Sequence, residues 1–185
     1  MKILVTGAAG FVGIPVCQAL SADGHSVTAV TRTAPAVRLA AERTEVLGEL
    51  SRDTDWRAAL SGIDAVVHLA GRAHVLDEDK NEADRLYREA NVAVLEGLAE
   101  AAVQYGVKRF VFISSIKVNG EETHGTPFSA DQPPAPEDAY GRSKAEAEQR
   151  RRDRPAFAVG HVGQHAPVIF RAADVAHRHR AVAQQ

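Results

Sequence analysis

The amino-acid sequence predicts an α/β fold, a doubly wound parallel sheet with helices on both faces. Short apolar runs alternate with segments of helical periodicity over residues 1–149, which is the pattern of repeated β-α-β units. The apolar runs are continuous, as expected for strands buried under helices on both sides. The first run, Ile3–Val5, leads through a glycine-rich turn into a helical pattern. We therefore expect one parallel sheet within a single core.

Length and charge favour one domain that binds a small molecule. A chain of 185 residues is long enough for one core and short for two. The formal net charge of −2 gives no general case for nucleic acid or an anionic membrane as a partner. No apolar run approaches the ~18 residues that cross a bilayer, and no secretory signal pattern follows Met1, so we expect a cytoplasmic location. The single cysteine, Cys17, cannot form an internal disulfide and indicates no metal site.

The first half of the chain is expected to contain four strands and three helices. Apolar runs predict the strands, and helical spacing or turn residues at the ends predict the helices. In chain order these are a strand at 3–5, a helix at 11–22, a strand at 27–30, a short helix at 35–42, a strand at 45–47, a helix at 53–60 and a strand at 64–70. Asp53 or Thr54 is expected to cap the last of these helices.

The second half is dominated by one long helical pattern. Apolar residues recur at four-residue steps from Leu86 to Ala102, which predicts an amphipathic helix at 83–105 ending at Gly106. The charged stretch at 74–84 is predicted to be a surface loop. Three further elements are expected: a central strand at 109–115, an irregular loop at 121–138 and a helix at 139–150.

The composition changes after residue 149. Residues 150–185 contain seven arginines, two aspartates and four of the eight histidines, and no lysine. Apart from one strand predicted at 156–162, no periodicity is sustained, and we interpret the segment as a disordered or poorly packed basic tail. Its histidines lack the converging acidic or cysteine partners of a metal site. Its arginines lack the interleaved aromatic residues typical of single-stranded nucleic-acid binding.

The glycine-rich turn has the features of a nucleotide-binding loop. Gly7, Gly10 and Gly13 recur at three-residue spacing between a buried strand and a helix. Glycines allow a sharp turn and a close approach of the backbone to a ligand. The N-terminus of the following helix would direct free N–H groups and a positive dipole end at a pyrophosphate.

Tyr140, Lys144 and Ser115 form a candidate proton-transfer group. Residues four apart on a helix share a face, so Tyr140 and Lys144 can approach the same ligand. A neighbouring ammonium and a cationic nicotinamide would lower the pKa of a tyrosine from its usual value near ~10, which suits a general acid/base. Ser115 stands at the predicted carboxyl end of a central strand, where α/β proteins bind ligands. It can therefore hydrogen-bond the same substrate oxygen as Tyr140.

This combination resembles the extended short-chain dehydrogenase/reductase superfamily, in the NAD-dependent epimerase/dehydratase branch that includes UDP-glucose 4-epimerase. The glycine turn, the strand that ends in Ser114-Ser115, and the Tyr140/Lys144 helix carry the resemblance, which covers residues 1–149. It implies an NAD(P)-binding Rossmann domain over those residues and a nucleotide-sugar substrate, expected to be a UDP-sugar. It also implies a homodimer through the two long helices.

The resemblance implies a role for each matching residue. Ser115, Tyr140 and Lys144 match the catalytic trio. The implied cofactor-binding positions are Gly7, Gly10, Phe11, Val12, Gly13, Glu49, Leu50, Leu69, Ala70, Gly71, Asn91, Tyr140 and Lys144. Glu49 stands where the family usually has an adenine-contacting aspartate, and Lys144 is expected to bind the nicotinamide ribose. Asn91 is equally well interpreted as a helix-kinking or core amide, and His68 as a core residue.

Two departures from the family pattern narrow the expected function. Arg32 follows the second strand, where NAD-preferring members place an acidic residue. Because an arginine there can pair with a 2′-phosphate, we favour NADP over NAD as the cofactor and leave both open. Ile116 and Lys117 stand where the 4,6-dehydratases have an Asp-Glu pair, which disfavours dehydration. An epimerase or a 4-ketoreductase that transfers a hydride at a sugar carbon remains.

The resemblance also implies a C-terminal substrate domain, and residues 150–185 show no recognisable part of it. One hypothesis is a truncated or frame-shifted product of a longer gene. The alternative function is therefore a non-catalytic NAD(P)-binding module or an inactive truncated enzyme.

Overall fold

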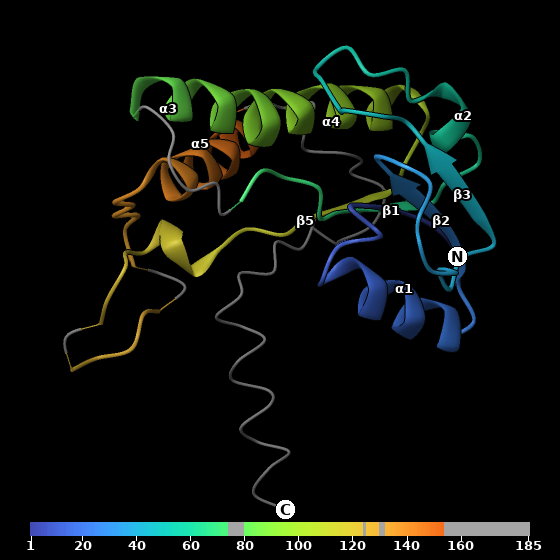
Figure 1. Ribbon diagram of the computed structural model, residues 1–185, viewed down its shortest axis with the longest axis horizontal. Helices are drawn as coiled ribbons and strands as arrows, with labels where there is room; N and C mark the ends of the chain where they lie inside the picture. Colours follow the sequence, from blue (N-terminus) through green and yellow to red (C-terminus); the bar gives the residue numbers. More distant parts are fainter. Residues whose placement is uncertain (74–79, 124, 130–131, 154–185) are drawn as a thin grey trace, which may run out of the picture.

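A parallel sheet forms the centre of the molecule (Figure 1). The computed structural model describes residues 1–73, 80–123, 125–129 and 132–153. Within these residues five strands pair in parallel in the order β3-β2-β1-β4-β5. They are β1 (Lys2–Thr6), β2 (Ser26–Thr31), β3 (Arg43–Val46), β4 (Ala65–His68) and β5 (Arg109–Phe112). The strand order reverses between β1 and β4, the place where doubly wound sheets open a ligand crevice.

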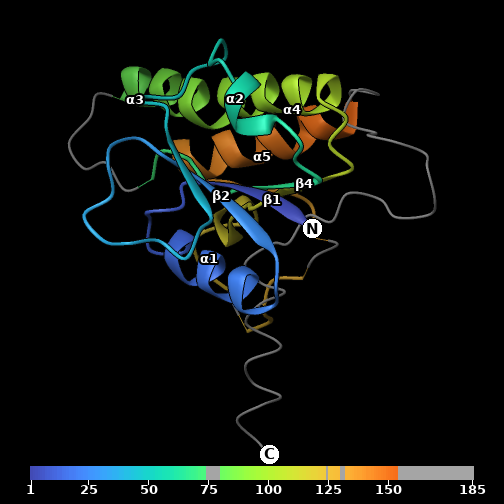
Figure 2. The ribbon, with the colours of Figure 1, turned by 90° about the vertical axis from the view of Figure 1, so that its right-hand side faces the viewer.

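Helices cover both faces of the sheet (Figures 1 and 2). α1 (Gly13–Ala22) lies on one face, and α2 (Arg57–Leu60), α4 (Val94–Gln104) and α5 (Ala139–Asp153) lie on the other. Each face has its own apolar cluster, which contains Cys17 on the α1 side and Leu98 and Ala147 on the opposite side. The predicted doubly wound, Rossmann-like fold is therefore confirmed.

Alternate residues of β1 supply the two apolar clusters. Leu4 packs into the cluster beneath α4 and α5, whereas Ile3 and Val5 pack into the cluster beside α1. None of the three side chains is more than 5% exposed. Successive side chains of a strand point to opposite faces, so a strand covered on both faces needs an unbroken apolar run.

The long helix predicted at 83–105 is part of a longer helical run with a π-helical turn inside it. α3 (Lys80–Arg88), the π-helix η1 (Glu89–Ala93) and α4 follow one another directly. The loop predicted at 74–84 is wrong for residues 80–84, which are helical, and residues 74–79 lie outside the described part. The run ends as predicted, because Gly106 adopts a φ of 70° just after the cap residue Tyr105.

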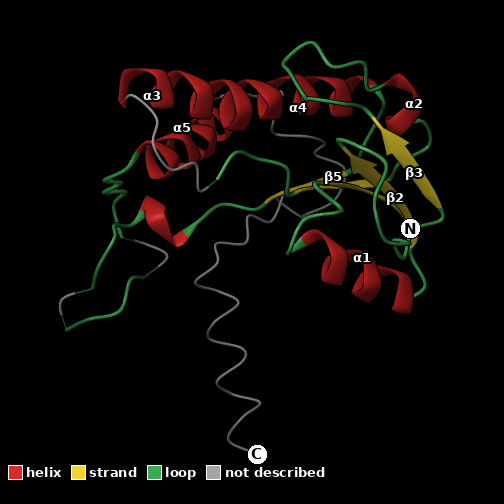
Figure 3. Ribbon diagram, in the orientation of Figure 1, coloured by secondary structure: helices red, strands yellow, loops and turns green. Residues whose placement is uncertain are grey.

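The short helix predicted at 35–42 is wrong. These residues form an irregular connection between β2 and β3, drawn entirely as loop in Figure 3. Leu39 is buried against the α1-side cluster, whereas most of its neighbours are exposed. So short a helix is not stable unless an apolar face packs against the core, and this segment offers one such anchor.

α2 is shorter than the helix predicted at 53–60. It begins at Arg57, whose amide donates a hydrogen bond to Asp55 Oδ1 over 3.0 Å. The expected cap at Asp53 or Thr54 is therefore wrong. The Thr54 hydroxyl instead accepts from the Ser51 amide (2.8 Å) and closes a turn before the helix.

β4 and β5 end earlier than predicted, and β5, expected to be a central strand, lies at the edge of the sheet formed by the described residues. β4 ends at His68 and β5 at Phe112, so the following residues form loops at the crevice edge of the sheet. The described residues of the 121–138 segment are irregular, as predicted. α5 continues past residue 149 to Asp153, and the strand predicted at 156–162 lies outside the described residues.

A buried hydrogen bond joins the ends of β1 and β4. Thr6 Oγ1 and His68 Nδ1 are 2.7 Å apart, and both residues are buried, which confirms His68 as a core residue. The Thr6 hydroxyl accepts from the amides of Leu69 and Ala70, both at 3.2 Å, so its proton is donated to His68. Burial, and to a smaller extent the charge of Lys144, lowers the pKa of His68 to about 3 and keeps the imidazole neutral.

The neutral imidazole predicts an acid-sensitive stability. Because the folded-state pKa of His68 lies below the unfolded value, the unfolded chain binds the proton more readily as the pH falls below about 6.5. This residue should remove about 2 kcal/mol of unfolding free energy between pH 7 and pH 5. Denaturant unfolding at both pH values should show a smaller loss for His68→Phe than for wild type. His25→Gln, outside the core, is the control, and an unchanged loss in His68→Phe would contradict this account.

Candidate functional site

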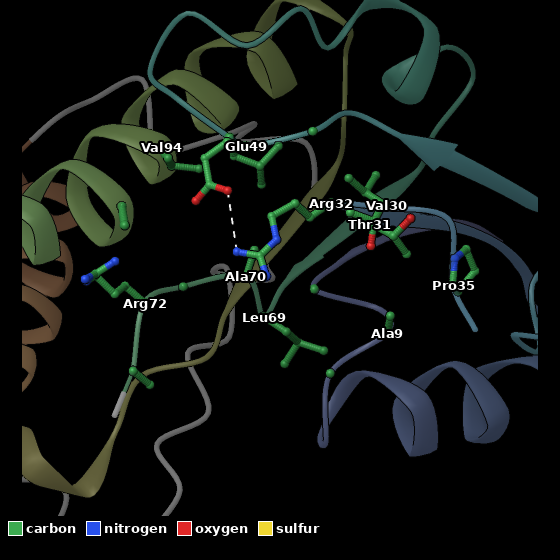
Figure 4. A pocket seen from close by; sticks show the side chains of 18 of the residues that line it. Ala9, Val30, Thr31, Arg32, Pro35, Glu49, Leu69, Ala70, Arg72 and Val94 are labelled. Atoms are coloured by element: carbon green, nitrogen blue, oxygen red, sulfur yellow. Dashed lines mark hydrogen bonds and ion pairs between the residues drawn. The ribbon is translucent and has the colours of Figure 1, made fainter. Parts of the chain in front are cut away.

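A cavity of about 670 Å³ opens at the carboxyl ends of β1, β2 and β4 (Figure 4). Its walls come from the β1–α1 turn and from the segments that follow β2, β3 and β4. The predicted cofactor-binding residues that line it are Gly7, Gly10, Arg32, Glu49, Leu50, Leu69, Ala70 and Gly71. The cavity therefore lies at the switch point of the sheet, where the strand order predicts a ligand.

The remaining predicted residues lie outside the lining. They are Phe11, Val12, Gly13, Asn91, Ser115, Tyr140 and Lys144. Phe11 is 96% exposed and Val12 is 50% exposed, so neither side chain packs under the turn. Their implied cofactor-binding role stays a prediction.

The β1–α1 turn is packed too tightly for side chains at two glycines. Gly7 has a φ of 66°, and a Cβ there would lie 2.8 Å from the amide nitrogen of Ala70. A Cβ at Gly13 would lie 2.1 Å from the carbonyl oxygen of Gly7. Only glycine fits at these two positions. Gly7 allows the turn to contact the loop after β4, and Gly13 allows the start of α1 to contact the turn.

The N-terminus of α1 has no side-chain cap. Val12 occupies the cap position without a side-chain hydrogen bond, and the first turn contains no acidic residue. The first amides of a helix need acceptors from outside the helix. Together with the dipole, they form a favourable position for an anion at the edge of the cavity.

An ion pair and an isolated hydroxyl lie on the β2 side of the cavity. Arg32 Nη1 and Glu49 Oε2 are 3.5 Å apart across the cavity mouth, and both side chains are well exposed (Figure 4). Such a pair is weak and can exchange partners. The Thr31 hydroxyl also belongs to the lining, and it is buried without a hydrogen-bond partner in the described residues. A bound ligand can satisfy both groups.

Asn91 is a clamp between two parts of the site. It lies in the π-helix and is 1% exposed. Its Oδ1 accepts from the Arg72 amide (2.8 Å), and its Nδ2 donates to the Arg72 carbonyl (3.1 Å) and to Ser143 Oγ (2.9 Å). The amide thus ties the loop after β4 to the helix that carries Tyr140 and Lys144. These bonds agree with the interpretation as a structural amide. Direct contact with the cofactor stays a prediction, since a Cβ at the cavity-lining Gly71 would lie 2.8 Å from Asn91 Oδ1.

Ser115 and Tyr140 come together from two elements. Ser115 caps the short 3-10 helix η2 (Ile116–Val118), and Tyr140 lies in the first turn of α5. Burial raises the pKa of Tyr140, and a hydrogen bond with Ser115 partly offsets this rise. The protein groups alone therefore keep Tyr140 protonated, whereas a lowered pKa was expected in the presence of a cationic nicotinamide.

Lys144 is buried one helical turn after Tyr140. Its Nζ donates to the Ile113 carbonyl (2.8 Å) and lies 4.3 Å from the centre of the Phe112 ring. Burial lowers the pKa of Lys144 to about 8, and the nearby Glu148 acts in the opposite direction. A Cβ at the cavity-lining Gly71 would lie 3.9 Å from Lys144 Nζ. The ammonium therefore adjoins the cavity.

Sequence reasoning missed several contributors to the site. Thr31 and the segment from Thr33 to Ala36 line the cavity, and Arg72 does so while its guanidinium lies 5.7 Å from the Tyr87 ring centre. The Tyr87 ring in turn meets the Tyr140 ring edge-on at 6.1 Å. The sequence could have indicated these cavity-lining residues, because they end or follow the predicted strands β2 and β4. Such positions line the ligand crevice in this fold class.

Two further properties of the described residues bear on the class of protein. Their histidine, cysteine and acidic side chains form no cluster of three or more that can hold a metal ion. Among their helices, none combines the length and apolar character that a membrane crossing requires.

The fold and the cavity define the class of protein: a doubly wound α/β domain with a ligand-sized cavity at its switch point. The profile of the NAD dependent epimerase/dehydratase family matches residues 3–153. The chain belongs to this family.

Relatives and solved structures agree with this assignment. A UDP-glucose 4-epimerase of Vibrio cholerae is 44% identical over 154 residues, which cover 80% of this chain and 45% of the relative. A dTDP-glucose 4,6-dehydratase of Streptomyces griseus is 34% identical over 77% of this chain and 46% of its own length.

Among solved structures, UDP-glucuronic acid 4-epimerase from Bacillus cereus, in complex with UDP-glucuronic acid and NAD, is similar with a TM-score of 0.72 and 30% identity. The match covers 92% of this chain and 56% of that one. MoeE5 in complex with UDP-glucuronic acid and NAD has a TM-score of 0.71 and 29% identity, over 92% of this chain and 53% of that one. The chain thus spans about half the length of the proteins it matches.

Proposed function

We propose that this chain provides the NAD(P)-binding and proton-transfer groups of a nucleotide-sugar epimerase or 4-ketoreductase, with residues 1–149 as the NAD(P)-binding domain. The observation that supports this best is the position of the Ser115, Tyr140 and Lys144 group. Lys144 adjoins Gly71 of the cavity wall, and Tyr140 lies one turn before Lys144 beside Ser115. A proton-transfer group beside a nucleotide-type cavity suits redox chemistry at a sugar carbon.

The cavity fits a dinucleotide in three respects. The turn at Gly7 and Gly10 lines the cavity with backbone alone. The uncapped start of α1 favours a pyrophosphate. The Thr31 hydroxyl, buried without a partner in the described residues, offers a hydrogen bond to a ligand. When bound there, NAD or NADP accepts a hydride from a sugar carbon or returns it.

The residues of this chain would hold and move the proton. Burial keeps Tyr140 protonated near neutral pH, which is the form that donates a proton to a sugar oxygen when a 4-keto group is reduced. Ser115, hydrogen-bonded with Tyr140, orients the phenol and can bond to the same sugar oxygen. Lys144 would hold a ribose hydroxyl through its ammonium.

The two candidate reactions differ in the fate of the cofactor. An epimerase returns the hydride to the opposite face of the same carbon, so the cofactor is unchanged after each cycle. A 4-ketoreductase consumes one reduced cofactor for each sugar.

UDP-sugars are the proposed substrates, because a relative is named UDP-glucose 4-epimerase and a structural neighbour holds UDP-glucuronic acid. The homodimer and the cytoplasmic location stay predictions.

A non-catalytic NAD(P)-binding module is the second candidate. Such a module would bind NADH but turn over no sugar nucleotide.

Tyr140→Phe should lower turnover by at least about 100-fold, because it removes the proton that is transferred. It should change NADH binding far less than turnover, since the ring remains. The measurements are chromatographic interconversion of UDP-glucose and UDP-galactose, and NADPH consumption with a UDP-4-keto-sugar. Tyr105→Phe, at the end of α4, is the matched control. Equal turnover in Tyr140→Phe and wild type would exclude Tyr140 as the proton-transfer residue, and NADH binding by wild type without turnover would favour the module.

We also propose a preference for NADP that depends on Arg32. The guanidinium can leave Glu49 and pair with a 2′-phosphate, whereas the Glu49 carboxylate opposes that phosphate. Arg32→Ala should weaken NADPH binding roughly tenfold more than NADH binding, and Glu49→Gln should shift the ratio towards NADPH. Fluorescence titration with both cofactors measures the ratio, with Arg38→Ala as the control on the same exposed segment. A ratio unaffected by Arg32→Ala would leave NAD as the expected cofactor.

A further inference from the structure

Lys117 joins three segments around the candidate proton-transfer group. It lies in η2, two residues after Ser115, and its side chain is 30% exposed. Its Nζ donates to Asp138 Oδ2 over 2.6 Å and to Glu121 Oε1 over 2.9 Å. One ammonium thus connects the turn of Ser115 with the start of the following loop and with the residue just before α5.

Asp138 bonds the first turn of α5 as well as Lys117. Its Oδ1 accepts a hydrogen bond from the Gly141 amide over 2.5 Å, so the carboxylate caps the helix around Tyr140. Burial acts to raise the pKa of Asp138, but hydrogen bonds from Lys117 and Gly141 outweigh it and hold the pKa below its usual range. The carboxylate is therefore ionised at neutral pH.

The backbone of η2 also touches α5 directly. A Cβ at Gly141 would lie 2.6 Å from the carbonyl oxygen of Lys117, so the two elements are packed against each other at this point. The Ala135 amide donates to the Val118 carbonyl over 2.9 Å and holds the preceding loop to η2. The positions of Ser115 and Tyr140 relative to each other depend on this contact region.

Charges of opposite sign face Tyr140 from this region. Lys117 from η2 favours the phenolate, and Asp138 disfavours it. The Tyr87 ring contacts Tyr140 from α3, while Arg142 of α5 pairs with Asp84 of α3 over 2.7 Å. The titratable groups that act on the phenol are Tyr87, Lys117 and Asp138. The neighbouring elements also carry the charged residues Arg72, Asp84, Glu121, Arg142 and Lys144. Within this set, Lys117 and Asp138 form a directly bonded pair of opposite sign.

We propose that Lys117 is a positioning residue for Tyr140. Its bond to Asp138 and its backbone contact with Gly141 hold the Ser115 turn against the first turn of α5. This inference rests on the proposed function, because it assigns Lys117 a part in the proton transfer by Tyr140. In the sequence, Lys117 is notable only because the 4,6-dehydratases have an acidic residue at this position. The structure gives the lysine there a role of its own, which is a fixed positive charge beside the proton-transfer group.

The test compares the two partners of the ion pair by titration of Tyr140 in the full chain. Lys117→Met removes the positive charge and Asp138→Asn removes the negative charge, while Asn keeps an oxygen that can accept from Gly141. The alkaline change in tyrosine absorbance follows all three tyrosines, and subtraction of the Tyr140→Phe titration isolates Tyr140. Far-UV circular dichroism at each pH confirms that the chain stays folded.

Opposite shifts are expected. Lys117→Met should move the Tyr140 titration to higher pH, and Asp138→Asn should move it to lower pH. Lys117→Arg keeps the charge and should restore the wild-type midpoint. Lys108→Met, at an exposed lysine just before β5 and so at the opposite end of that strand from Ser115, is the matched control and should have no effect. A merely structural salt bridge would give shifts in the same direction for both partners, and such a result, or no shift in either, would overturn the proposal.

The outcome is independent of the proposed function, because the titration needs neither cofactor nor substrate. If the chain fails to bind NADH, the proposed function fails, while opposite shifts would still support the coupling between Lys117 and Tyr140. If Lys117→Met does not fold, Asp138→Asn and Lys117→Arg decide the question, since the first must lower the midpoint and the second must preserve it.

Discussion

The site depends on the close contact between the β1–α1 turn and the loop after β4. At Gly7 a single added carbon would collide with the Ala70 amide nitrogen at 2.8 Å. The Thr6 hydroxyl holds the same loop by accepting hydrogen bonds from the amides of Leu69 and Ala70, while it donates its own hydrogen bond to the neutral His68. A buried threonine and histidine therefore position the wall of the cavity without facing it.

The second half of the site is attached to this wall through Asn91. Its amide bonds the backbone of Arg72 and the hydroxyl of Ser143, so the loop after β4 and the helix α5 are fixed to each other. The π-helical turn is the local irregularity that carries this residue at the buried side of a long helical run. The cavity and the candidate proton-transfer group thus adjoin because of hydrogen bonds that no sequence motif predicts.

Periodicity in the sequence predicted the fold well, because strands covered on both faces require unbroken apolar runs and Ile3, Leu4 and Val5 provide one. It failed at residues 35–42, where one anchor such as Leu39 does not define a helix. Motif spacing selected Gly7, Ser115, Tyr140 and Lys144. In the structure Gly7 lines the cavity, Lys144 adjoins it and Tyr140 lies beside Ser115. The contacts of Lys117 with Asp138, and of Asn91 with Ser143, join residues 21 and 52 positions apart, and spacing cannot predict them.

The central claim is that the Gly7 turn forms the wall of a nicotinamide dinucleotide site, and calorimetric titration with NADH and with NADPH tests it most directly. The account predicts saturable binding by wild type that is lost in Gly7→Ala and kept in Gly24→Ala. Both glycines have positive φ, at 66° and 79°, but a Cβ at Gly24 meets nothing within 4 Å. The two variants therefore carry similar backbone strain, and they differ in the contact of the added Cβ with Ala70. Absent binding by wild type, or an equal loss in both variants, would contradict the account.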